Sequence, residues 1–453
     1  MTRTIWALAL PAMATNLATA LFGLADTWAI GQLGDSAAQG AVDLGARALI
    51  SALTVFNFLR TATVALTARA VGADAQGPDA QFPDAQTADA QTAAALWRAL
   101  IVAGAIGAAL LALVPWAAPR APVWLGAGGR VADLAGHYIG LRGLAIPAAL
   151  ANMALTGWLI GQRHVRAVLG AEVAANVLHI ALDLLLVLGF GMGVSGVALA
   201  SVLSELARLL ALALIARRVW HTLGPARMPI WAPAIRDARA FRALAAMNGD
   251  LMMRTLLLIV TMLAFTRQSA QGGVAVLAAN GILMQWFLAA AMLLDGLETA
   301  AQVLCAQAQG AGDGAGLRRA LRHTLGWGLV LGLALGALQG LAGARLIAAF
   351  TLDPAVRAAA GAALPWAMAL PLIGASSFVL DGVFVGAGWT RGLLVTMAAA
   401  ALMFQGALML AAPLGNHGLW LAYALFLAAR AGAQGLWLAR QARQPARHAA
   451  RAG

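Results

Sequence analysis

Long apolar stretches recur along almost the whole of this 453-residue chain, and they constrain its fold more than any other feature. A helix needs roughly 20 apolar residues to cross the hydrocarbon core of a bilayer, and about twelve stretches approach that length. Charged residues make up 11% of the chain, well below the ~25% usual in soluble proteins. The sequence therefore predicts an all-α integral membrane protein with spans near 5–30, 43–70, 93–118, 131–160, 165–189, 194–219, 243–266, 273–305, 317–342, 356–386, 391–412 and 417–439.

Three short patterns occur twice, in the same order, once in each half of the chain. Because six spans separate the copies, both halves enter the membrane in the same sense. This indicates two six-helix lobes related by a parallel pseudo-two-fold repeat, with a substrate site expected between them. The matching pairs are Leu66–Ala73 with Leu304–Ala311, Gly157-x-x-x-Gly161 with Gly382-x-x-x-Gly386, and Gly193–Ala200 with Gly415–Ala422.

Polar and proline-rich segments mark the expected domain boundaries. We predict an N-terminal lobe at 1–220, a cytoplasmic linker at 221–241, a C-terminal lobe at 242–442 and a basic cytoplasmic tail at 443–453. Residues 74–91 repeat the triplet Asp-Ala-Gln, so 72–92 is predicted to be a flexible insertion in the first lobe.

Arginine carries the whole net charge of +12, since the chain holds no lysine. The arginines concentrate in alternate loops and in the tail, which predicts cytoplasmic termini for a multi-pass protein of the bacterial plasma membrane. Topology thus accounts for the basic character, and no nucleic-acid partner is expected. The single cysteine, Cys305, excludes an intramolecular disulfide.

Two carboxylates inside expected spans are the leading functional candidates. Asp26 lies in the first span and Asp183 in the fifth, where an acidic side chain costs about 2.5–3.5 kcal/mol on insertion scales. His179 precedes Asp183 by four residues, one helical turn, and Ser201 offers a hydroxyl from the next span. We expect this set to bind a coupling ion, and a His–Asp pair can exchange a proton near neutral pH.

The second half has its own intramembrane acids. Asp295 and Glu298 share a helix face at i, i+3 spacing, and Asp381 stands nearly alone in its span. These three are expected to face an interior cavity. Asp250 and Arg254, at i, i+4 spacing, are predicted to neutralise each other.

Enzymatic and ATP-driven functions find no support in the motifs. The chain lacks a Gly-x-Ser-x-Gly elbow, a paired-histidine metal motif and a phosphate-binding Gly-x-x-x-x-Gly-Lys loop. We therefore expect a non-enzymatic protein without a cofactor, energised by an ion gradient of H⁺ or Na⁺.

Several of these motifs resemble the multidrug and toxic compound extrusion (MATE) family, and its DinF-like branch in particular. The resemblance runs from about Leu8 to Trp437. The motifs that resemble those of the family are Leu10-Pro11, Gly23–Gly31, Phe58–Thr61, Gly157–Gly161, Asn176–Asp183, Asn248–Asp250 with Arg254, Leu294–Gly296 and Leu380–Gly386.

The resemblance implies two lobes around a central cavity that opens alternately to the cytoplasm and the outside. It also implies efflux of drugs or toxins, a coupling-ion role for Asp26 and Asp183, and bending of the first helix at Pro11. The family commonly has Asn at the position of His179 and Thr at that of Ser201. The branch often has Glu where this chain has Gln302, although Glu298 lies one turn earlier.

The expected function is export of amphipathic organic cations by a monomer, with H⁺ favoured over Na⁺ because imidazole replaces an oxygen donor. Asp295, Glu298, Gln302 and Asp381 are the candidate cavity residues. The alternative is a flippase for lipid-linked saccharides or other lipids, for which cationic residues inside the cavity spans would be expected.

Overall fold

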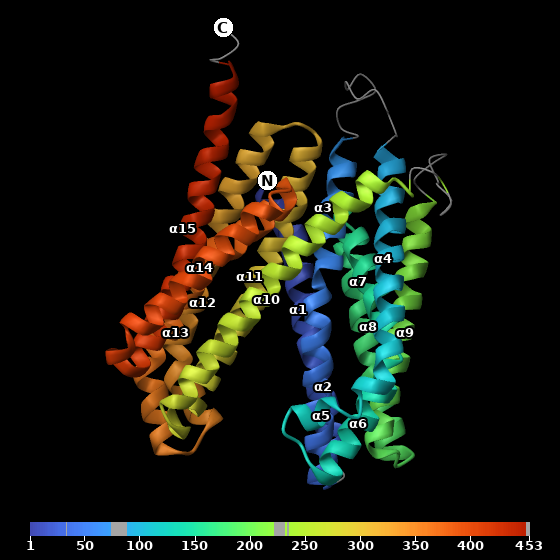
Figure 1. Cartoon of the computed structure of the whole chain (residues 1–453), viewed down its shortest axis with the longest axis vertical. Coiled ribbons are helices and arrows are strands. Elements are labelled where there is room, and N and C mark those ends of the chain that lie inside the picture. The colour runs from blue at the N-terminus through green and yellow to red at the C-terminus, as the bar shows by residue number, and fades with distance from the viewer. Residues whose placement is uncertain (33, 74–87, 222–231, 233–234, 450–453) are drawn as a thin grey trace. The chain divides into compact units, whose positions relative to one another are not determined.

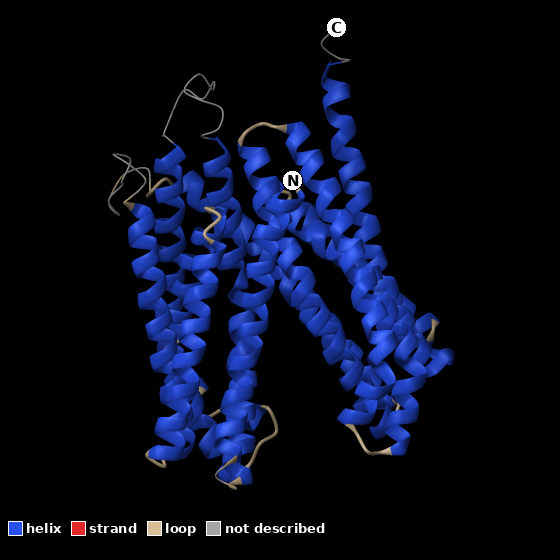
Figure 2. Cartoon of the chain, turned by 180° about the vertical axis from the view of Figure 1, so that it is seen from behind, coloured by secondary structure: helices blue, strands red, loops and turns tan. Residues whose placement is uncertain are grey.

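The computed structural model describes all residues except 33, 74–87, 222–231, 233–234 and 450–453, and it omits the side chains of 19–25, 27, 88 and 442–449. Helices account for its regular structure, and the described residues contain no strand (Figures 1 and 2). The elements are α1 (Thr2–Gly31), α2 (Ser36–Thr54), η1 (Val55–Asn57), α3 (Phe58–Ala73), α4 (Ala88–Ala117), α5 (Ala121–Trp124), α6 (Gly129–Gly143), α7 (Ile146–Gly161), α8 (Val165–Asp183), η3 (Leu184–Gly189), α9 (Gly193–Trp220), α10 (Ala238–Gln271), α11 (Val274–Gly310), α12 (Gly314–Phe350), α13 (Pro354–Ala387), α14 (Thr390–Leu410), η5 (Ala412–Leu414) and α15 (Gly415–Ala449).

Every predicted span coincides with one helix or with two or three consecutive helical elements, so the all-α membrane fold is confirmed. Within the described residues, 10 helical segments are long and apolar enough to cross a bilayer. The pair α6–α7, bent by 50° at its break, raises this to 11 if it forms one span. Helix α1 adds the remaining apolar stretch, but several of its side chains lie outside the described part.

The chain divides into two compact units. The N-terminal unit comprises 14–248 and Gly310–Gly312, and the C-terminal unit comprises 1–13, 249–309 and 313–453. Helices α1 and α10 each pass from one unit into the other, so the division differs from the predicted boundaries of 220 and 242. The predicted lobes stay a prediction. Most of the predicted linker, and the Asp-Ala-Gln repeats up to residue 87, lie outside the described residues.

The repeated glycine pairs pack in the same way in both units. In the N-terminal unit, a Cβ on Gly157 of α7 would collide with the carbonyl oxygen of Arg60 on α3. In the C-terminal unit, a Cβ on Gly382 of α13 would collide with the carbonyl oxygen of Glu298 on α11. Small residues let two helix backbones approach this closely. The sequence duplication therefore corresponds to a duplicated helix–helix contact.

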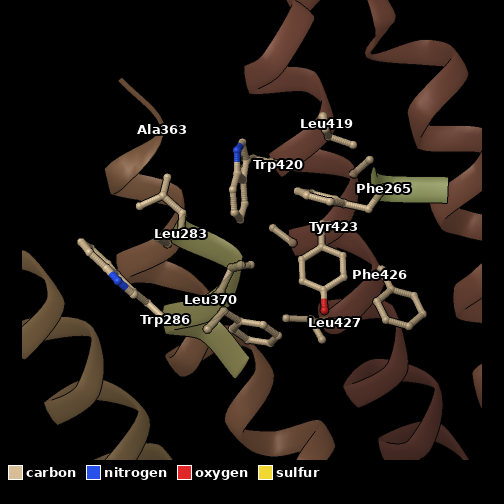
Figure 3. Packing of buried hydrophobic residues seen from close by; sticks show 14 of the residues in the cluster. Phe265, Leu283, Trp286, Ala363, Leu370, Leu419, Trp420, Tyr423, Phe426 and Leu427 are labelled. Carbon is tan, nitrogen blue, oxygen red and sulfur yellow. The ribbon is translucent and has the colours of Figure 1, made fainter. Parts of the chain in front are cut away.

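Aromatic and aliphatic residues together form the core of the C-terminal unit (Figure 3). Trp420, Tyr423 and Phe426 recur at three-residue spacing on α15, which puts them on neighbouring parts of one helix face. The ring of Trp420 meets Phe265 of α10 at 5.1 Å, and Tyr423 meets Phe287 of α11 at 5.6 Å, both edge to face. These contacts fix α15 against α10 and α11.

Candidate functional site

Asp26, His179 and Asp183 come together in the N-terminal unit, and each is at most 1% exposed. Nε2 of His179 lies 2.6 Å from Oδ1 of Asp26 and 3.2 Å from Oδ2 of Asp183. Helix α1 is fixed to α8 nearby, where the Asn176 side-chain amide donates to the carbonyl oxygen of Ala18 at 2.8 Å. The structure thus brings together the three ionisable residues that we singled out from the first half of the sequence.

A hydroxyl that the sequence reading missed fixes the orientation of the imidazole. Oγ of Ser204, on α9, donates to the carbonyl oxygen of Ser201 at 3.0 Å and lies 3.2 Å from Nδ1 of His179. The Ser204 hydroxyl has one proton, and it donates that proton to the carbonyl oxygen of Ser201. Its contact with His179 is therefore one in which the Ser204 oxygen accepts from Nδ1–H. The Nε2–Oδ1 contact with Asp26 then requires a proton of its own, carried by the imidazole or by the carboxyl group.

Two buried carboxylate oxygens of this cluster, Oδ2 of Asp26 and Oδ1 of Asp183, have no hydrogen-bond donor among the described residues. Oδ2 of Asp183 lies 3.2 Å from Nε2 of His179, and Ser201 interacts with the Tyr138 hydroxyl. Ligand atoms of the two aspartates and His179 lie within 4.8 Å of one another, so the cluster can hold a proton or a cation. Ser201, on α9, is 2% exposed, and its role in ion binding stays a prediction.

Asp183 ends the regular part of α8, and the chain continues as the π-helix η3. Such wider turns inside helices are frequent at functional sites. The apolar run that forms η3 gave no sign of this change in the sequence.

A second buried charge cluster lies in the C-terminal unit around Asp381. Its Oδ2 accepts from Arg254 of α10 and, at 2.5 Å, from Arg430 of α15, while Oδ1 accepts from Gln434 at 2.6 Å. The predicted Asp250–Arg254 pair is wrong. Asp250, which is half-buried, instead accepts from Arg391 at 3.2 Å, and Arg254 turns to the more deeply buried carboxylate.

The other candidates of the second half lie on α11. Asp295 and Glu298 are half-buried and interact electrostatically with Arg254 and Arg430. Gln302, one turn beyond Glu298, is 5% exposed. Pro11 lies inside α1, two residues before the point where this helix passes between the units.

Ionisable clusters buried within the spans of a multi-span helical fold are typical of membrane transporters. The comparison with known families agrees, because residues 11–185 and 251–408 match the MatE family model. The chain belongs to the MATE family, whose members are transporters and not enzymes. DNA damage-inducible protein F of Escherichia coli (strain K12) is 35% identical over 93% of this chain and 88% of its own length.

Two solved structures show the same fold. A MATE protein crystallised in a bent conformation superposes with a TM-score of 0.83 and is 20% identical, covering 96% of this chain and 94% of its own. A transporter of the MOP superfamily from Pyrococcus furiosus Vc1 (DSM3638) gives a TM-score of 0.83 at 19% identity with the same coverage. The latter was described as having a binding pocket of reversed polarity.

Proposed function

We propose that this MATE-family transporter exports amphipathic organic cations in exchange for protons, by alternating access. The observation that carries the proposal is the contact of one imidazole nitrogen, Nε2 of His179, with the carboxylates of Asp26 and Asp183. A buried group that binds a proton in one state and releases it in another is what antiport requires.

The ligand chemistry favours H⁺ over Na⁺. Sodium, a hard cation like the alkaline earths, prefers several oxygen ligands, whereas an imidazole nitrogen suits protons and transition metals. His179 occupies the middle of the cluster, where the family commonly supplies an amide oxygen. The proton demanded by the contact between Asp26 and His179 supports the same choice.

Acidic residues of the C-terminal unit support a cationic substrate. Asp295 and Glu298 are half-buried on α11 and are proposed to line the substrate pathway with Gln302 and Asp381. The buried arginines Arg254 and Arg430 are the cations that a flippase for lipid-linked saccharides would need. Both bind Asp381, so their charge is already partly compensated, which favours the exporter.

The proposal also covers the membrane location, the topology and the partners of the protein. The alternation of arginine-rich and arginine-poor loops supports cytoplasmic termini, and the similarity to the Escherichia coli protein supports a bacterial inner-membrane location. The proposed partners are the bilayer and small amphipathic molecules, and we propose that the chain works as a monomer.

Transport in proteoliposomes tests the proposal. Export of a cationic dye should follow an imposed pH gradient and ignore a sodium gradient. Asp26→Asn and Asp183→Asn should each abolish it, and His179→Asn should weaken its response to the pH gradient. Asp43→Asn is the matched control, since Asp43 forms an exposed ion pair with Arg47 at 2.8 Å. Export that follows a sodium gradient in the wild type, without response to pH, would contradict the assignment.

A further inference from the structure

Arg142, in the last turn of α6, places a permanent positive charge beside the coupling cluster. Its Nη1 donates to the Tyr138 hydroxyl at 2.6 Å, and its guanidinium carbon lies 5.7 Å from the centre of the Tyr138 ring. The same Nη1 lies 3.9 Å from Oδ2 of Asp26, at ion-pair distance. Tyr138, which is fully buried, thus holds the guanidinium next to the acid without a direct hydrogen bond to it.

The charges of the cluster balance when Arg142 is included. Asp26 and Asp183 contribute two negative charges, the proton in the His179–Asp26 contact contributes one positive charge, and Arg142 contributes the other. Glu205 also interacts with Arg142, and it shares Arg208, at 3.8 Å, with Glu172, which lies closer to that guanidinium at 2.9 Å. With one bound proton, Asp26, His179, Asp183 and Arg142 together are therefore neutral, and without Arg142 the other three would carry one net negative charge.

We propose that Arg142 is the residue that excludes sodium from the Asp26–His179–Asp183 cluster, because it supplies as a tethered side chain the charge that a bound sodium ion would bring. The inference rests on the proposed proton coupling and names the determinant of its ion selectivity.

A proton and a sodium ion respond differently to this neighbour. A proton forms a covalent bond to one nitrogen or oxygen atom and can be held despite a nearby cation. Sodium binds by electrostatic attraction to several oxygens, and a fixed guanidinium within a few ångströms subtracts directly from that attraction in a low-dielectric interior. Arginine does not lose its charge at any physiological pH, so the exclusion is permanent.

The test measures sodium binding to the purified protein without any gradient. Thermal unfolding is followed by tryptophan fluorescence in NaCl and in choline chloride at equal ionic strength. We expect the wild type to unfold at the same temperature in both salts. Arg142→Gln should show a saturable rise in unfolding temperature with sodium, equivalent to at least about tenfold tighter binding than the wild type.

Matched variants separate the charge of Arg142 from its packing. Arg142→Met retains much of the apolar stem and should behave as Arg142→Gln does, while Arg142→Lys keeps the charge and should stay insensitive to sodium. Arg130→Gln, on the same helix but paired with Asp35, is the control for loss of an arginine from α6. Adding Asp183→Asn to Arg142→Gln should remove the sodium effect.

The outcomes distinguish this inference from the proposed function. Sodium-specific stabilisation of the wild type would overturn both the exclusion and proton selectivity. A sodium response absent from folded Arg142→Gln and Arg142→Met would overturn the role of Arg142 alone. Sodium binding gained in these variants would support it, even if the wild type proved to transport a different class of molecule.

Discussion

Asp381 and Arg430 form an ion pair at 2.5 Å in which the two side chains are only 1% and 3% exposed. Arg254 reaches the same carboxylate from another helix, so one acid compensates two guanidinium groups. In the interior of a helix bundle such an arrangement links α10, α13 and α15 through a single side chain. Asp381 therefore helps to hold three helices together, in addition to any contact with substrate.

Replacing Asp381 with Asn should therefore destabilise the protein strongly. Removing one member of a buried ion pair leaves an uncompensated charge and costs about 3–5 kcal/mol. We expect a clear drop in the thermal unfolding temperature in detergent. Asp43→Asn, which removes an exposed acid, should cost less than about 1 kcal/mol. Equal stability of the two variants would show that Asp381 does not hold the helices together.

Ser204→Ala should slow proton-driven export without unfolding the protein. The variant removes the acceptor for Nδ1–H of His179, and a hydrogen bond of about 1 kcal/mol corresponds to roughly fivefold in rate. Ser204→Thr keeps the hydroxyl and should retain most of the activity. Ser195→Ala is the control, because Ser195 bonds an exposed histidine, His137, at 2.9 Å. Equal rates in both alanine variants would remove Ser204 from the coupling site.

Asp35 makes stability depend on acid pH. It caps the N-terminus of α2, and the backbone N–H of Ala38, together with the Arg130 guanidinium, holds the pKa of its carboxyl below the usual range. A lowered folded-state pKa stabilises the fold above the unfolded-state pKa, and the effect is lost as pH falls. The wild type should thus exceed Asp35→Asn in unfolding temperature at pH 7, and the difference should shrink progressively as the pH falls below about 4. A constant difference across this range would contradict the prediction.

Pro11→Ala should impair export while leaving membrane insertion intact. Proline cannot donate to the carbonyl of Ala7, and alanine restores that hydrogen bond and stiffens α1. The thermal unfolding temperature should stay the same or rise, since proline in a helix interior costs about 3 kcal/mol. Pro115→Ala, within α4, tests whether any helix proline has this effect. Unchanged export in Pro11→Ala would mean that α1 bending is dispensable.

Local regularities in the sequence were sufficient to predict much of this structure. Hydropathy located the helices because a bilayer demands about 20 apolar residues for each span. Helical periodicity placed His179 one turn before Asp183, and the repeated patterns indicated a duplication, which the structure contains as the same close glycine contact in both units.

Contacts between residues far apart in the sequence could not be predicted from hydropathy, helical periodicity or repeats. Asp26 meets His179 across 153 residues, and the relative position of α1 and α8 depends on packing that no short pattern encodes. Spacing also misled us for Asp250 and Arg254, because proximity on a helix surface contributes only a few tenths of a kcal/mol. A more deeply buried acid 127 residues away, Asp381, competes better for the guanidinium of Arg254.

The passage of α1 between the two units has a consequence for dissecting this transporter into fragments. A gene split between the halves would encode a second fragment lacking Met1–Met13, which belongs to the C-terminal unit. Ala9 and Met13 pack directly against Gly296 of α11, so that fragment would expose the surface they cover. The halves should therefore be obtainable only by co-expression. Appending a copy of the first thirteen residues to the second fragment should raise its yield when it is expressed alone.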